Sequence, residues 1–214
     1  MHIADGTLSI EVVVVGAVVA VGAVGLGLKR LSYDRVPRVG VLASVFFVAS
    51  LIHIRIGPSS AHLLLNGLLG TLLGWAVFPA LAAALFLQAL LLGFGGVTVL
   101  GPNVIIMGVP AVIVYYATRV MGGRGRRMPF LRGVVAGGGG VLLSCVFMAL
   151  ALCVSDAESY AKVAKALLIV HLPVIVIESI VSGAALAFLY RVYPAFLEDG
   201  VSCTVADGGV GGLS

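Results

Sequence analysis

Seven long apolar stretches, rarely interrupted by a charge, dominate this 214-residue chain and limit what it can fold into. They cover residues 9–28, 36–54, 62–78, 80–93, 101–119, 133–154 and 163–190. A helix needs about 20 apolar residues to cross a bilayer core about 30 Å thick. Strands of a membrane barrel would alternate apolar and polar residues, whereas these stretches are continuously apolar. We therefore predict an all-α polytopic membrane bundle of seven transmembrane helices, with its least defined boundary at Pro79.

The composition excludes several other classes of protein. The chain is 61% hydrophobic and 10% charged, whereas a soluble domain carries about 25% charged residues. Its three cysteines (Cys145, Cys153 and Cys203) lack the CxxC spacing of a zinc site and form no obvious disulfide framework. No phosphate-binding GxxxxGK[ST] motif and no HExxH zinc motif occurs. We therefore expect neither nucleotide hydrolysis nor other catalysis by this chain.

The basic residues predict the orientation of the bundle. In a seven-span arrangement, ten of the thirteen lysines and arginines lie on one side of the membrane, and only Arg55, Lys162 and Lys165 lie on the other. The side richer in basic residues is normally cytoplasmic. We therefore expect a multi-pass protein of the bacterial or archaeal cytoplasmic membrane with its N-terminus outside. Residues 1–195 would form the membrane domain, and residues 196–214 a short flexible cytoplasmic tail.

The first residues, "MHIADG", have the chemistry of a metal chelate rather than of a signal sequence, because no basic region precedes the apolar run. Methionine aminopeptidases remove Met1 only before a small residue, so the bulky His2 should preserve a free Met1 amine. This amine, the backbone nitrogen of His2 and the His2 imidazole can close two fused chelate rings. Such planar nitrogen donors suit Ni²⁺ and Cu²⁺, and under some conditions Co²⁺.

His62 is the best candidate for a fourth donor in the plane. In "GPSSAHLLLNG", Gly57 and Pro58 predict a turn, and Ser59 or Ser60 could cap a helix whose first turn holds His62. From spacing alone, however, an ordinary second residue and an interfacial histidine are the commoner explanation of His2 and His62. His53 could be a ligand on the entry path of the metal, but an interfacial anchor for its helix is the commoner role.

Polar side chains within the apolar stretches are candidates for function because they are costly in a membrane. His171 and Glu178 lie seven residues apart, which places them on one face of the last helix. Glu178 could bond to the N-terminal segment, to a neighbouring helix or to a subunit. Gln88 and Asn103 could orient metal ligands, although bonds between helices are slightly favoured for both. Asn103 follows a Gly-rich segment that we expect to be non-helical.

Small residues predict close helix packing in two places. Gly16 and Ala20 are spaced by four residues in the first span, and residues 136–140 read "AGGGG" in the sixth. Such surfaces let neighbouring backbones approach closely. The sequence leaves open whether their partners belong to this chain or to another.

Four motifs make the chain resemble the CbiM/NikM family, the substrate-capture membrane components of energy-coupling-factor transporters for cobalt and nickel. The motifs are "MHIADG", "SSAH" at 59–62, "LQALLLGFGGVTVLGPNV" at 87–104 and "HLPVIVIESIV" at 171–181. The resemblance extends from residue 1 to about residue 195. Leu63 and Leu64 depart from the residues common after the histidine in relatives, a change at the rim of the pocket that removes no ligand.

The resemblance implies seven membrane helices and an N-terminal segment that folds into the bundle centre. It implies that the Met1 amine, the His2 amide nitrogen, the His2 imidazole and His62 bind Co²⁺ or Ni²⁺. Ser59, Ser60, Gln88, Asn103, His171 and Glu178 would support the pocket. No organic cofactor is expected.

The same resemblance implies that ATP is hydrolysed elsewhere. The expected partners are a coupling transmembrane component (CbiQ/NikQ-like), cytoplasmic ATPase subunits (CbiO/NikO-like) and a separate small accessory membrane protein (CbiN/NikN-like). Nucleic acid is not expected as a partner. The metal could supply cobalamin biosynthesis or nickel enzymes, and we lean to cobalt.

Two other functions are open on the sequence. A stand-alone secondary carrier or channel for divalent metals would need acidic relays in several spans, whereas Glu178 is the only carboxylate deep in a helix. A membrane-embedded metalloenzyme would need an open coordination position, which a planar site with four nitrogen donors does not provide.

Overall fold

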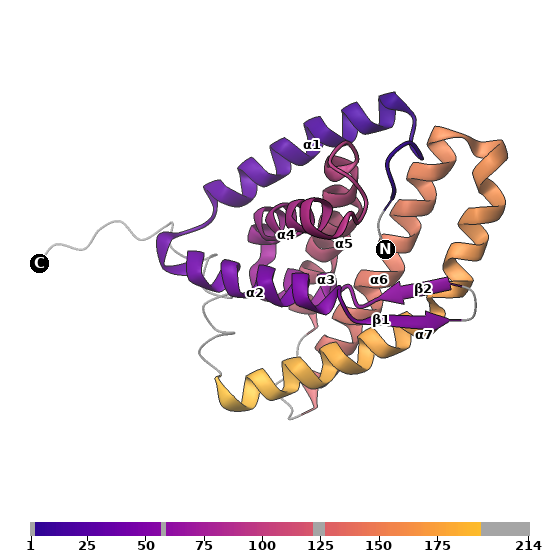
Figure 1. Ribbon diagram of the computed structural model, residues 1–214. Helices are drawn as coiled ribbons and strands as arrows, with labels where there is room; N and C mark the ends of the chain where they lie inside the picture. The colour runs from indigo at the N-terminus through magenta and orange to yellow at the C-terminus, as the bar shows by residue number, and fades with distance from the viewer. Residues whose placement is uncertain (1–2, 57–58, 122–126, 194–214) are drawn as a thin grey trace, which may run out of the picture.

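A computed structural model describes residues 3–56, 59–121 and 127–193 and shows a helical bundle (Figure 1). The α-helices in these ranges are α1 (Ile10–Lys29), α2 (Val36–Ala49), α3 (Asn66–Leu73), α4 (Val77–Leu92), α5 (Leu100–Val120), α6 (Met128–Ser155) and α7 (Ala157–Val192). Two 3₁₀ turns are η1 (Tyr33–Arg35) and η2 (Gly74–Ala76), and two antiparallel strands are β1 (His53–Ile56) and β2 (Ser59–His62). The tail proposed for residues 196–214 lies outside the described ranges.

The prediction of a helical membrane bundle is confirmed, while the count of seven crossings stays a prediction. Five helical runs in the described ranges are long and apolar enough to cross a membrane. They are Ile10–Lys29, Asn66–Leu92, Leu100–Val120, Met128–Ser155 and Ala166–Val192. With 14 residues, α2 is shorter than each of these five runs. The run Asn66–Leu92 is broken at Gly74, whose backbone has φ +56° and ψ −128°, and Pro79 lies in the first turn of α4 beyond this break.

The centre of the bundle is the short helix α3, most of whose residues are buried. Two glycines allow this burial. A Cβ on Gly67 would collide with the backbone oxygen of Ala136 in α6, and one on Gly70 with that of Ala111 in α5. The backbones of three helices therefore meet without intervening side chains, as small residues permit in membrane proteins.

The predicted packing surface at residues 136–140 has partners within the chain. A Cβ on Gly137 would overlap the backbone of Glu178 and lie 2.7 Å from Ser182 Oγ, both in α7. On the other side of α6, a Cβ on Gly140 would lie 2.7 Å from Gly67 Cα. The glycine segment thus holds α6 between α7 and α3, and α6 and α7 form the helical hairpin on the right of Figure 1.

The surface around Gly16 and Ala20 is also internal. A Cβ on Gly16 would lie 2.7 Å from Pro102 Cγ, and one on Gly101 would lie 2.5 Å from Ala17 Cα, so α1 packs against the start of α5. Ala20 is buried, whereas Val18 and Val21 are 69% and 74% exposed. The opposite face of α1 is therefore an apolar face suited to lipid.

The segment before α3 differs from the prediction. We expected a helix to 54 and another from 62, but α2 ends at Ala49 and α3 begins at Asn66. Between them the β-hairpin pairs His53 with His62 and Ile56 with Ser59. His62 therefore ends a strand instead of occupying the first turn of a helix, and Ser59 and Ser60 precede no helix that they could cap. The reason lies in "HIRIGPSSAH", where β-branched residues alternate with polar ones up to a Gly-Pro pair.

Candidate metal site

The N-terminal segment of residues 3–9 lies between α1 and the end of α6 (Figure 1), with Ile3 and Leu8 buried and residues 4–6 exposed. Ile3 is 2% exposed and shares an apolar cluster with Val99 and Leu152. The Asn103 side chain accepts a hydrogen bond from Ile3 N–H (3.0 Å) and donates one to the Ile3 carbonyl (3.2 Å). An amide is the side-chain group that can satisfy both backbone groups at once, so Asn103 fixes the residue that follows His2.

Three further contacts hold the same segment. Asp5 N–H donates to the Gly95 carbonyl (3.0 Å), and Thr98 Oγ1 donates to the Asp5 carboxylate. Gly96, at φ +136°, leaves room for that carboxylate, because a Cβ there would overlap it. At the start of α1, Ser9 N–H donates to Ser155 Oγ (3.2 Å) at the end of α6. The segment is therefore tied to the 93–99 loop, to α5 and to α6.

Glu178 holds the chain directly after the β-hairpin. Its carboxylate is fully buried and accepts hydrogen bonds from the backbone N–H groups of Leu64 and Leu65, with Leu65 N at 3.0 and 3.1 Å from the two oxygens. Leu65 has φ +50°, a left-handed conformation uncommon for a residue with a side chain. Successive N–H groups around such a residue form an anion-binding concavity. The carboxylate from α7 thereby fixes the residues next to His62.

His171 lies on the same face of α7 as Glu178, as predicted, with the buried Val174 between them. It is 8% exposed, and its Nδ1 is 2.8 Å from the Leu167 carbonyl of its own helix. A carbonyl only accepts, so Nδ1 carries the hydrogen in this contact. In the neutral ring, Nε2 then has the free lone pair.

Gln88 and Asn103 have different roles in the structure. Gln88 Nε2 donates to Ser50 Oγ (2.8 Å), which joins α4 to the residue that ends α2. This is the bond between helices that the sequence slightly favoured for Gln88. Asn103 instead contacts the N-terminal segment, and it lies in the first helical turn of α5. The non-helical backbone expected around it is confined to the preceding loop, where Gly93, Gly95 and Gly96 have positive φ.

Two features of this region carried little signal in the sequence. Asn66 is fully buried, and its Nδ2 donates to the Met107 carbonyl (3.1 Å) and to Ser144 Oγ (2.8 Å). An asparagine after an apolar run looks like a turn residue, so its role as a link between α3, α5 and α6 was missed. The backbone N–H groups of Leu64 and Leu65 were missed because any residue type supplies them.

The proposed ligands themselves are only partly described. Met1 and His2 lie outside the described residues, and the backbone of His62, Ser59 and Ser60 lies in β2. Within the described parts of the chain, no three His, Cys, Asp or Glu side chains come together as a metal site. The structure does describe the residues that neighbour the proposed ligands. Ile3, the first described residue, is hydrogen-bonded to Asn103, and Leu64 and Leu65 are hydrogen-bonded to Glu178.

This arrangement is the fold of a transition metal transporter. A solved structure described as a truncated transition metal transporter superposes with a TM-score of 0.71 at 25% sequence identity, covering 89% of this chain and 99% of that one. A second transition metal transporter superposes with the same TM-score at 24% identity, covering 94% and 98% of the two chains.

Sequence comparison defines the family. The profile described as "CbiM: Cobalt uptake substrate-specific transmembrane region" matches residues 2–196. A putative metal transport protein of Haemophilus influenzae is 39% identical over 92% of this chain and 97% of its own length. A putative cobalt transport protein CbiM of Methanocorpusculum labreanum is 32% identical over 92% of each chain. The chain belongs to the CbiM family of substrate-specific transmembrane components in cobalt and nickel uptake, a transport family and not a catalytic one.

Proposed function

We propose that this chain captures Co²⁺ or Ni²⁺ at the outer face of the membrane through its own N-terminus. The Met1 amine, the His2 amide nitrogen, the His2 imidazole and the His62 imidazole would supply four donors in one plane. Nitrogen donors in this geometry suit Ni²⁺ and, with strong donors, Co²⁺. The transported ion is the substrate, and we lean to cobalt.

The observation that carries this proposal is that buried polar side chains fix both segments next to the proposed ligands. Asn103 bonds to both backbone groups of Ile3, which follows His2, and Glu178 bonds to Leu64 and Leu65, which follow His62 by two and three residues. Partners that orient ligands in this way raise metal affinity.

The arrangement of the helix ends supports a bundle of seven crossings with the N-terminus outside. Residues 5, 9, 95 and 155 meet at one end of the bundle. From Ser9, the 20 residues of α1 run about 30 Å to Arg30 at the other end, which equals the thickness of a bilayer core. The basic residues after α1 and at the end of α5 would then face the cytoplasm.

Partners would supply the energy for transport. We propose a coupling membrane component, a pair of cytoplasmic ATPases and a small accessory membrane protein, all separate from this chain. The fused nickel transport protein NikMN of Rhodobacter capsulatus is 33% identical over 64% of this chain, which spans only 42% of that protein's length.

Glu178 also bears on the alternative of a carrier driven by an ion gradient. Such a carrier needs carboxylates that can exchange protons or ions along the path. Glu178 is the only acidic residue among the buried polar residues described, and both its oxygens accept backbone hydrogen bonds. It is therefore engaged in positioning the chain, which favours the capture component over the carrier.

The proposal is tested by equilibrium binding of Co²⁺ and Ni²⁺ to the purified protein with its native N-terminus. Two leucines inserted between Met1 and His2 keep every side chain, leave a bulky residue after Met1 so that Met1 is retained, and separate the amine from its chelate ring. We expect tight binding to be lost, because two of the planar donors no longer share a ring. The metal that binds the native protein more tightly then becomes the leading substrate.

The matched control is two leucines inserted between Gly208 and Gly209, which lengthens the chain equally and leaves the N-terminus intact. This control should bind metal like the native protein. Equal binding by all three proteins would contradict the proposal and direct attention to His53, His62 and His171 as a conventional histidine cluster. A His53→Gln variant separates these two outcomes, because it should keep native binding under the proposal and should lose one donor in a conventional cluster.

A further inference from the structure

At the end of the bundle opposite the N-terminal segment, the structure contains a cavity of about 500 Å³. It lies between the connection from α1 to α2, the turn η2 and the last turns of α5. Four arginines line it: Arg30, Arg35, Arg38 and Arg119. None of the described residues that line this cavity is acidic. Four guanidinium groups around one cavity, with no carboxylate among the lining residues, favour an anionic occupant.

Aromatic side chains hold two of these arginines in place. The Arg30 guanidinium lies 4.7 Å from the centre of the Trp75 ring, and that of Arg119 lies 4.6 Å from the centre of the Tyr115 ring. Trp75 Nε1 in turn donates to Tyr116 Oη (2.9 Å). Cations stacked on ring faces in this way are oriented before a ligand arrives, which reduces the entropy lost on binding.

The chemistry of the arginines selects the kind of anion. A planar guanidinium presents pairs of N–H donors that match two oxygens of a phosphate group. Trp75, Tyr115 and Tyr116 are the residue types that gather at the level of lipid headgroups. The cavity therefore combines side chains suited to bind a phosphate group with aromatic side chains typical of the membrane interface.

The surroundings of the cavity indicate that the phosphate belongs to a lipid. Val36 and Val120, which follow the cavity residues Arg35 and Arg119 in the sequence, are 48% and 86% exposed. The cavity therefore has an exposed apolar flank. Acyl chains would cover such an apolar flank, whereas free phosphate would leave it bare. We propose that this cavity is a binding site for the phosphate headgroup of an anionic phospholipid, such as phosphatidylglycerol. Basic pockets between membrane helices bind anionic lipid headgroups in this way.

The experiment uses Trp75, which is the only tryptophan in the chain and lines the cavity. The full-length protein is reconstituted in phosphatidylcholine bilayers that contain 20% brominated lipid as a quencher, as phosphatidylglycerol in one sample and phosphatidylcholine in the other. We expect the brominated phosphatidylglycerol to quench Trp75 fluorescence more strongly, because the site concentrates that lipid beside the indole ring.

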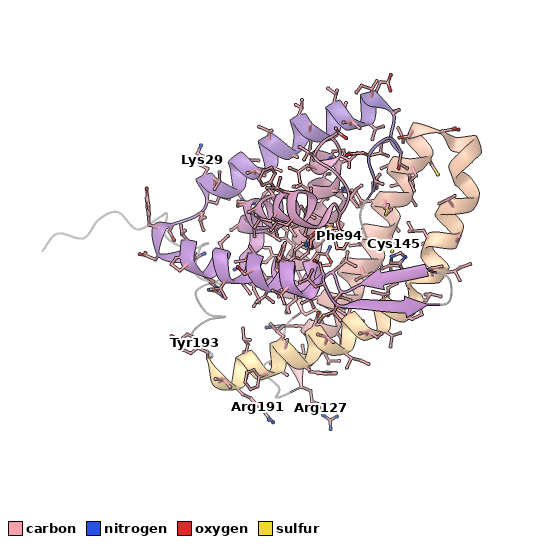
Figure 2. The ribbon with its side chains drawn as sticks, viewed as in Figure 1. Lys29, Phe94, Arg127, Cys145, Arg191 and Tyr193 are labelled. Carbon is pink, nitrogen blue, oxygen red and sulfur yellow. The ribbon has the colours of Figure 1, made fainter. Side chains whose placement is uncertain are left out.

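The variant Arg35→Gln/Arg38→Gln removes two charges without touching the arginine stacked on Trp75. It should lose the preference for phosphatidylglycerol by roughly fivefold or more, the factor that one basic residue near a membrane surface contributes. The matched control, Arg127→Gln/Arg191→Gln, removes two charges that are not among the residues lining the cavity. Both of these side chains lie at the lower edge of the molecule in Figure 2. It should keep the preference of the native protein to within about twofold.

Three results would overturn the proposal. Equal quenching of the native protein by the two brominated lipids would show that no anionic lipid collects at Trp75, whatever the variants do. A change in Trp75 emission on adding millimolar inorganic phosphate in pure phosphatidylcholine would assign the cavity to a soluble anion. A change on deleting residues 196–214, whose sequence contains Glu198, Asp199 and Asp207, would assign it to an acidic protein segment.

Discussion

Two buried side chains, Asn103 and Glu178, show how single residues can build a site from the backbone. Among the residues that the structure describes, each bonds to main-chain groups and not to another side chain. Because any residue type offers the same N–H and carbonyl groups, the partners Ile3, Leu64 and Leu65 could not be predicted from their identities. The sequence singled out Asn103 and Glu178 as candidates, since polar groups in apolar helices are costly, but it could not say what they bond.

Glu178 provides a direct test of this positioning role. Glu178→Ala should weaken Co²⁺ or Ni²⁺ binding about 10- to 100-fold, the usual effect of removing a group that orients a ligand. Glu178→Gln should have a smaller effect, because its amide oxygen can still accept the hydrogen bonds that Oε1 receives from Leu64 and Leu65. Equilibrium binding and the thermal stability of the metal-free protein are measured together.

Glu11→Gln is the control for this pair, since Glu11 is an exposed carboxylate in the first turn of α1. It should bind metal like the native protein. If the two Glu178 variants lost stability without metal but bound it with native affinity, Glu178 would stabilise the fold alone, and the positioning role would be refuted.

At the level of elements, the long apolar helices could be predicted and the segment between α2 and α3 could not. Long uninterrupted runs such as those of α5 and α6 fit only a membrane helix. The short run after Gly57 and Pro58 fits a strand or a helix equally well. Here the backbone of Leu65, which is hydrogen-bonded to Glu178, has a left-handed conformation, so α3 begins only at Asn66. That contact spans more than a hundred residues, so local propensity could not reveal it.

The close packing of α3 leads to a prediction about stability. Gly67→Ala should destabilise the protein by about 1–3 kcal/mol, because the new methyl group would collide with the Ala136 carbonyl and push α3 away from α6. The gain in helix propensity, about 1 kcal/mol, does not offset this collision. Thermal unfolding followed by the fluorescence of Trp75 measures the change.

Gly22→Ala is the matched control, because the same methyl group at Gly22 in α1 would meet nothing within 4 Å. It should leave the unfolding temperature unchanged or raise it. Equal destabilisation by both substitutions would mean that helix propensity, and not the contact between α3 and α6, decides the outcome.

At the level of the whole molecule, the bundle has two chemically different ends. The N-terminal segment, the 93–99 loop and Ser155 meet at one end, and the arginine-lined cavity lies at the other. The sequence predicted this polarity from the uneven distribution of basic residues. It could not predict the cavity, because Arg30, Arg38 and Arg119 converge only when three connections of the chain fold together.

The polarity predicts the sidedness of two exposed positions. In a cysteine-free background, Tyr33→Cys should react with a membrane-impermeant maleimide only from the cytoplasmic side, and Val97→Cys only from outside. Tyr33 and Val97 are 94% and 58% exposed, so both thiols are accessible to the reagent. Labelling of intact cells and of inverted vesicles distinguishes the sides. Reaction of both positions from the same side would refute the seven-crossing arrangement.

The bonds of the N-terminal segment also set the order in which the chain can complete itself during synthesis. Ile3 can form its hydrogen bonds only after Asn103 has been synthesised. The same holds for Ser9 and Ser155, and for Leu65 and Glu178. At translation speeds of about 5–20 residues per second, the first residues made remain without their partners for on the order of ten seconds or more. A chain that stops short of Glu178 could not hold the segment beside His62. Stable binding of a metal ion would therefore be possible only after the ribosome has synthesised nearly the entire membrane domain.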